Sequence, residues 1–98
     1  MERRRLGRTG HESGVAILGA AAFWDTTVDN VADAFARADA AGANHLDIAP
    51  QYGNAERMVG PLVPAMRDQL FVAGKTLRSN PDGVEAQFDD TRRLLGCE

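Results

Sequence analysis

Three polar side chains of complementary chemistry stand in the middle of the sequence: the carboxylate of Asp47, the phenol of Tyr52 and the ammonium of Lys75. A free phenol titrates near pH ~10 and is therefore a weak acid at neutral pH. A neighbouring lysine cation favours the phenolate and lowers that value, while a carboxylate can keep the lysine charged and in place. These residue types predict a proton-donating site if the fold brings them together.

Each of the three residues also has an ordinary structural interpretation. An aspartate at the end of a strand can cap the next helix, a Tyr-Gly pair is common in loops, and a single lysine is usually solvated. Taken one at a time, Asp47, Tyr52 and Lys75 are more often structural than catalytic. Their spacing alone therefore leaves both interpretations open.

The strands that must position these residues follow a hairpin. Gly7 and Gly10 mark its turn, and it leads into a buried strand expected at about residues 15–20. Further strands are expected at residues 43–49, which contain Asp47, and at residues 70–74, which Lys75 follows. The candidate residues should therefore lie at, or just after, the ends of strands.

Helices are expected between these strands. Apolar residues recur at helical spacing over residues 28–41, after a threonine that can cap the first turn. Residues 55–67 should form two short helical pieces divided by prolines, with Asn54 as a cap. The last helix should begin with the cap, proline and acid that start at Asn80 and should end at Gly96.

Strands that alternate with helices imply an α/β fold with a parallel sheet and right-handed crossovers. Such units could begin either a flavodoxin-like sheet or a (β/α)8 barrel. A (β/α)8 TIM barrel takes ~250 residues and builds its active site at the carboxyl ends of its strands. The 98 residues therefore predict one partial domain over residues 1–98, a β-hairpin plus about three βα units, and we expect a truncated chain.

The composition and charge of the chain indicate which binding partners to expect. The chain is 44% hydrophobic and 26% charged, with a formal net charge of −3, which is typical of a globular domain and predicts no nucleic-acid partner. Cys97 is the only cysteine, so a reducing, cytoplasmic compartment is the default. His11 and His45 have no carboxylate or thiol at ligand spacing, so no metal site is predicted.

The N-terminal arginines and the apolar run that follows them superficially imitate a secretory signal. However, the polar residues 7–12 separate the two, and Asp25 closes the run. The run at residues 15–24 is also far shorter than the ~20 apolar residues that a membrane span needs. We therefore expect neither a signal peptide nor a membrane partner.

The surroundings of the three candidate residues resemble the aldo-keto reductase family. Residues 45–56 resemble its pattern of Asp, Ala two positions later, Tyr-Gly and then Glu, and residues 71–76 resemble its strand ending in Lys-Thr. Residues 5–10 resemble its opening hairpin, and residues 83–96 its third helix. The resemblance covers residues 3–96 in order.

The resemblance implies roles for the three residues and a nicotinamide hydride donor, with NADP(H) favoured over NAD(H). Asp47, Tyr52 and Lys75 align with three members of the family's catalytic tetrad. Tyr52 would be the general acid for a small-molecule carbonyl, Lys75 would favour its phenolate, and Asp47 would pair with Lys75. The fourth member, a histidine, lies on the next strand in the family.

Cofactor contacts are implied more weakly. The family usually has a Gly-Thr pair after the first strand, near the nicotinamide ribose, where this chain has Gly19 followed by three alanines. Gly19 and Ala20 would therefore contact the cofactor through their backbone, with Asp47 beside them. Glu56 matches the pattern and is expected to be structural.

Three interpretations of function follow. The chain is a fragment of an oxidoreductase that reduces aldehydes or ketones to alcohols, or runs the reverse, and is inactive alone. Alternatively, it comes from a regulatory subunit of the same superfamily that binds nucleotide without significant turnover, or it is the product of a degraded gene or an incomplete gene prediction. The sequence leaves the substrate and the oligomeric state open.

Overall fold

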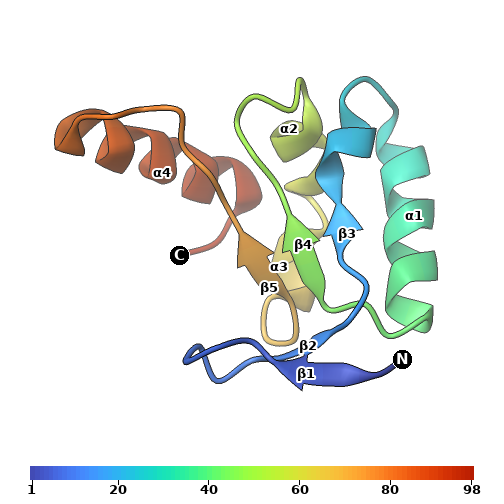
Figure 1. Ribbon diagram of the computed structural model, residues 1–98. Helices are drawn as coiled ribbons and strands as arrows, with labels where there is room; N and C mark the ends of the chain where they lie inside the picture. The colour runs from blue at the N-terminus through green and yellow to red at the C-terminus, as the bar shows by residue number, and fades with distance from the viewer.

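The computed structural model describes residues 1–98 and contains two sheets (Figure 1). The antiparallel hairpin joins β1 (Arg3–Arg5) to β2 (Glu12–Gly14). The parallel sheet has the order β3-β4-β5, from β3 (Leu18–Gly19), β4 (His45–Asp47) and β5 (Phe71–Ala73). Only β4 has a neighbour on both sides, so β3 and β5 form the edges of the sheet. The expected hairpin and parallel sheet are thus confirmed.

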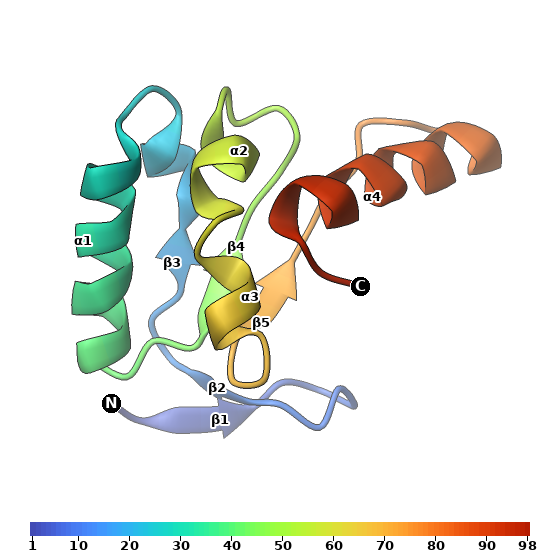
Figure 2. The same ribbon diagram turned by 180° about the vertical axis from the view of Figure 1, so that it is seen from behind.

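Helices cover one face of the parallel sheet. The helical elements are η1 (Ala20–Phe23), α1 (Val28–Ala40), α2 (Ala55–Val59), α3 (Val63–Met66) and α4 (Pro81–Leu95). Seen from behind, α2 and α3 lie in front of the strands, α1 lies beside β3, and α4 extends to the side of β5 (Figure 2). None of these helices combines the length and the apolar character needed to cross a membrane.

The longer helices begin and end at the expected signals. Thr27 caps α1, because its side-chain oxygen accepts a hydrogen bond from the backbone N–H of Asn30 at 3.2 Å. Asn80 caps α4 in the same way, with the N–H of Gly83 at 2.7 Å. Gly96 ends α4 in the left-handed conformation, at φ 61°.

Two local expectations were wrong. Asn54 precedes α2, but its side chain makes no capping hydrogen bond, and its backbone N–H donates instead to the carbonyl of Trp24 at 3.0 Å. The buried strand expected at residues 15–20 is reduced to β3, and Val15 and Ile17 are each 51% exposed. The N–H of Val15 still bonds to Glu2 of the hairpin, so residues 15–17 cross from one sheet to the other without a covering element.

The core lies between the parallel sheet and its helices. Its buried members are Ala20, Phe23, Val31, Phe35, Leu46, Ile48, Ala55, Val59, Val63, Leu70 and Leu95. Leu46 on β4 and Ile48 just beyond it are fully buried. Because successive side chains of a strand point to opposite faces, His45 and Asp47 point away from the helices.

The hairpin attaches to the sheet through His45 and its neighbour Asn44. The Nδ1 of His45 lies 3.1 Å from the Ser13 hydroxyl, and its ring meets the Phe71 ring edge-on at 4.9 Å. Asn44 accepts from the N–H of Gly14 at 2.8 Å and donates to a hairpin carbonyl at 3.0 Å. The contact brings His11, distant in sequence, within 6.5 Å of His45 between ring centroids.

The environment of His45 favours the neutral imidazole. Burial lowers the pKa of His45, the nearby His11 lowers it further, and the carboxylate of Asp47 acts in the opposite direction without reversing the shift. In the unfolded chain this histidine titrates near ~6.5. Its contribution to stability is therefore present above that pH and is lost as the pH falls through it towards the lower folded pKa.

We expect the free energy of unfolding to fall between about pH 7.5 and about pH 5, partly because His45 must become charged in a buried place. A His45→Gln variant keeps a polar side chain but does not titrate, so its stability should depend less steeply on pH. Urea unfolding of both proteins across this range measures the difference. Identical slopes for the two proteins would show that His45 does not contribute to it.

Candidate active site

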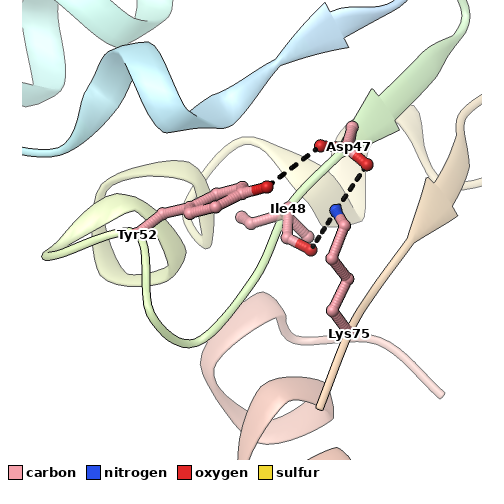
Figure 3. A network of polar contacts seen from close by, with 4 residues as sticks. All are labelled: Asp47, Ile48, Tyr52 and Lys75. Carbon is pink, nitrogen blue, oxygen red and sulfur yellow. Dashed lines mark hydrogen bonds and ion pairs between the residues drawn. The ribbon is translucent and has the colours of Figure 1, made fainter. Parts of the chain in front are cut away.

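Asp47, Tyr52 and Lys75 come together at the carboxyl ends of β4 and β5 (Figure 3). The Nζ of Lys75 lies 2.5 Å from Oδ1 of Asp47, and the hydroxyl of Tyr52 donates to the other carboxylate oxygen at 3.4 Å. The Lys75 ammonium also lies 5.2 Å from the centroid of the Tyr52 ring. The structure thus gathers all three predicted side chains around one carboxylate.

Strand register explains why Asp47 and Lys75 meet. β4 and β5 are parallel, with Asp47 opposite Ala73, and the N–H of Ile48 extends the pairing to the carbonyl of Ala73 at 3.0 Å. Lys75 follows Ala73 by two positions and therefore points to the same face as Asp47. Its ammonium also approaches the Ile48 carbonyl at 3.5 Å.

A tight turn between β4 and α2 positions Tyr52. The N–H of Tyr52 donates to the carbonyl of Ala49 at 3.1 Å, and its own carbonyl accepts from Ala55 at 3.0 Å. Gly53 follows in the left-handed region, at φ 57°, and packs directly against Trp24. The turn is therefore held at both ends and against the segment after η1.

The charges of the site support one another. Partial burial of the Lys75 ammonium acts to lower its pKa, but the hydrogen bonds and charges of Asp47 and Tyr52 outweigh this effect and leave the pKa of Lys75 above its ordinary value. The side chains of Lys75 and Asp47 remain 38% and 36% exposed. Lysine is thus held as a cation at a place that small molecules can reach.

This arrangement can move a proton to an external oxygen. The Tyr52 hydroxyl is a donor that already points towards the cluster, and the Lys75 cation stands beside its ring to stabilise the phenolate left behind. Asp47 anchors that cation through the shorter of its two contacts. The chemistry is general acid catalysis, or general base catalysis in the reverse direction.

The two other residues assigned to a cofactor are placed differently. Gly19 lies opposite Asp47 in the register of β3 with β4, is exposed, and would have no atom within 4 Å of an added Cβ. Ala20 is fully buried in the core. The open space at Gly19 leaves its backbone accessible to a ligand, whereas the side chain of Ala20 faces only protein.

Several neighbours of the site were missed in the sequence. Trp24 is 55% exposed against Gly53, and Gln87 of α4 bonds to the segment after Lys75. No local pattern marks either residue, because both contacts depend on how loops return to the sheet. Glu56, expected to be structural, is 7% exposed, and one of its carboxylate oxygens has no hydrogen-bond partner.

Comparison with known proteins shows a family match and several similar solved structures. The sequence matches the aldo/keto reductase family over residues 14–98, whereas no curated protein matches it. A solved structure assigned to the aldo-keto reductases of Pseudomonas aeruginosa superimposes with a TM-score of 0.89 at 25% identity, and a second from that organism with 0.86 at 24%. An aldo-keto reductase from Bacillus halodurans in its holo form gives 0.80 at 22%.

The matches cover this chain almost completely but only part of each solved structure. They include 97% of this chain and 42% of the chain of each Pseudomonas structure, and 99% of this chain and 37% of the Bacillus structure. The chain thus spans less than half the length of the structures that it resembles. Its fold is the corresponding part of their TIM barrels, preceded by the hairpin.

Gly53 provides a test of the turn that carries Tyr52. An added Cβ would lie 2.6 Å from the Trp24 carbonyl, in a backbone conformation that disfavours side chains, so Gly53→Ala should lower the free energy of unfolding by about 1–2 kcal/mol or more. Urea unfolding measures this loss, and fluorescence of Trp24, the only tryptophan, reports on the turn.

Gly19→Ala is the matched control. Gly19 has φ −85° and open space around it, so the substitution should be neutral or slightly stabilising. Equal losses in the two variants would show that the contact with Trp24 does not constrain the Tyr52 turn.

Proposed function

Because the chain belongs to the aldo/keto reductase family, we propose that it supplies the proton-donating part of an NAD(P)H-dependent oxidoreductase that interconverts carbonyl compounds and alcohols. The observation that carries this proposal is the contact of Lys75 and Tyr52 with the single carboxylate of Asp47. Family membership supports the oxidoreductase class, and the geometry of these side chains supports the assignment of their roles.

Tyr52 acts as the general acid in this proposal. Its O–H bond breaks as the carbonyl oxygen of the substrate takes the proton, while a bound nicotinamide would supply the hydride to the carbonyl carbon. The phenolate that remains on Tyr52 is stabilised by the Lys75 ammonium, 5.2 Å from the ring centroid. Asp47 keeps that ammonium in place, and in the reverse direction the phenolate accepts the proton of an alcohol.

The cofactor is assigned to the open space beside β3. The exposed backbone of Gly19 and the carboxylate of Asp47 would hold the nicotinamide and its ribose, whereas Ala20, the first residue of η1, is fully buried and would not contact them directly. We favour NADP(H) over NAD(H), a small-molecule carbonyl as substrate and a cytoplasmic location. These finer assignments extend beyond the family match.

The proposal can be tested in a completed barrel, made by joining residues 1–98 to the remaining strands of one of the Pseudomonas structures. Tyr52→Phe removes only the hydroxyl and should lower turnover of an aldehyde panel by about 10²–10⁴-fold, because the proton donor is lost. Oxidation of NADPH, followed by its absorbance, measures the effect. Asp33→Asn, an exposed position on α1, is the control and should leave turnover unchanged.

Measuring NADPH binding alongside turnover distinguishes loss of the proton donor from loss of the cofactor site. Tyr52→Phe should still bind NADPH, as measured by quenching of protein fluorescence, since the hydroxyl serves the reacting oxygen. Full turnover in Tyr52→Phe would show that Tyr52 is not the acid. Binding of NADPH without turnover in the parent barrel would favour the regulatory, nucleotide-binding alternative.

We also expect the 98-residue chain alone to be inactive. The related structures have more than half of their length outside the matched part, and the site described above contains no histidine. The purified chain should therefore neither bind NADPH tightly nor reduce aldehydes, which isothermal titration and an absorbance assay would measure. Cofactor-dependent reduction by this chain would contradict the expectation.

A further inference from the structure

Gln87 reaches from α4 to the segment that directly follows Lys75. Its side-chain oxygen accepts two hydrogen bonds, from the Thr76 hydroxyl at 2.5 Å and from the backbone N–H of Leu77 at 2.9 Å. Both donors lie in the loop between β5 and α4, and Thr76 is partly buried. One neutral side chain therefore ties the start of this loop to the helix that follows it.

A third hydrogen bond extends the attachment. The backbone N–H of Arg78 donates to the Thr76 hydroxyl oxygen at 3.0 Å, so this hydroxyl accepts one bond while it donates another to Gln87. The directions are fixed, because a backbone N–H can only donate and the Gln87 oxygen can only accept. Three consecutive residues of the loop are thus connected to Gln87, directly or through Thr76.

After Lys75, the apolar residue of the loop does not take over this function. The side chain of Leu77 is 68% exposed, so it does not anchor the loop in the core. Gly74, on the other side of Lys75, packs against Phe88 of α4, where an added Cβ would lie 3.5 Å from the ring, and β5 already ends at Ala73. The backbone before Lys75 therefore has an apolar contact with α4, whereas the backbone after Lys75 is held by the polar attachment to Gln87.

We propose that Gln87 is a positioning residue for Lys75, which by holding Thr76 and Leu77 keeps the Lys75 ammonium against Asp47 and the Tyr52 ring. The importance of this position for catalysis rests on the proposed function, but the geometric effect does not. Gln87 carries no charge, so it fixes the direction of the lysine without competing with Asp47 for its cation. It also links α4, most of which lies beside the sheet, to the site.

The composition of the chain makes this inference measurable in the 98-residue protein. Lys75 is the only lysine and Tyr52 the only tyrosine, so isotope-labelled lysine gives one side-chain signal in NMR spectra, and a nuclear Overhauser effect between it and a tyrosine ring can arise from one pair alone. The raised pKa of Lys75 provides a second measure, because it depends on the contacts with Asp47 and Tyr52.

Gln87→Met keeps the length of the side chain but removes the acceptor. We expect the Overhauser effect between Lys75 and Tyr52 to be lost and the titration midpoint of Lys75 to move to lower pH. Gln87→Glu restores an acceptor oxygen and should preserve the Overhauser effect, and its added negative charge should not lower the titration midpoint of Lys75. Glu85→Met, an exposed substitution on the same helix, is the matched control and should change neither.

Thr76→Val and Thr76→Ser test the attachment from the other side and serve if Gln87→Met does not fold. Valine removes the hydroxyl and should reproduce the loss, whereas serine keeps it and should not. Unchanged Lys75 signals in folded Gln87→Met, or in Thr76→Val, would overturn the proposal. An active Tyr52→Phe barrel would contradict the proposed function and leave the positioning of Lys75 intact, so the two failures are distinguishable.

Discussion

The burial of Leu46 and Ile48 against the helices constrains everything else on β4 and at its end. Because the side chains alternate, His45 and Asp47 must point to the opposite face, one near each end of a strand of three residues. His45 then meets the hairpin through Ser13, and Asp47 meets the lysine and the tyrosine. A shift of one residue in register would bury the carboxylate and release both attachments.

Elements with local signals were predictable. These signals act within a few residues of the chain, so their effects are visible in the sequence. They are the caps at Thr27 and Asn80, the glycine after α4 and the prolines in the segment 55–67. Residues 15–17 were not predictable in this way. An apolar run becomes buried only where another element covers it, and here it passes uncovered from the hairpin to β3.

In the candidate site, too, some residues were predictable from the sequence and others were not. Strand ends and the family resemblance located Asp47, Tyr52 and Lys75, because parallel strands bring their carboxyl ends to one edge. The supporting contacts escaped prediction. Gln87 meets Thr76 only because α4 turns back beside β5, and His11 meets His45 only because the hairpin folds under the sheet. No regular spacing in the sequence marks such contacts, although they determine where the predicted side chains point.

The edges of the parallel sheet affect how the polypeptide behaves in solution. β3 and β5 each have one neighbour, so their outer N–H and C=O groups can pair with any extended backbone that reaches them. Pairing of these edges between molecules therefore depends on the protein concentration. In dilute solution, water forms hydrogen bonds with these groups. At higher protein concentration, pairing between molecules competes with water, so the yield of monomeric protein falls unless further backbone covers the two edges.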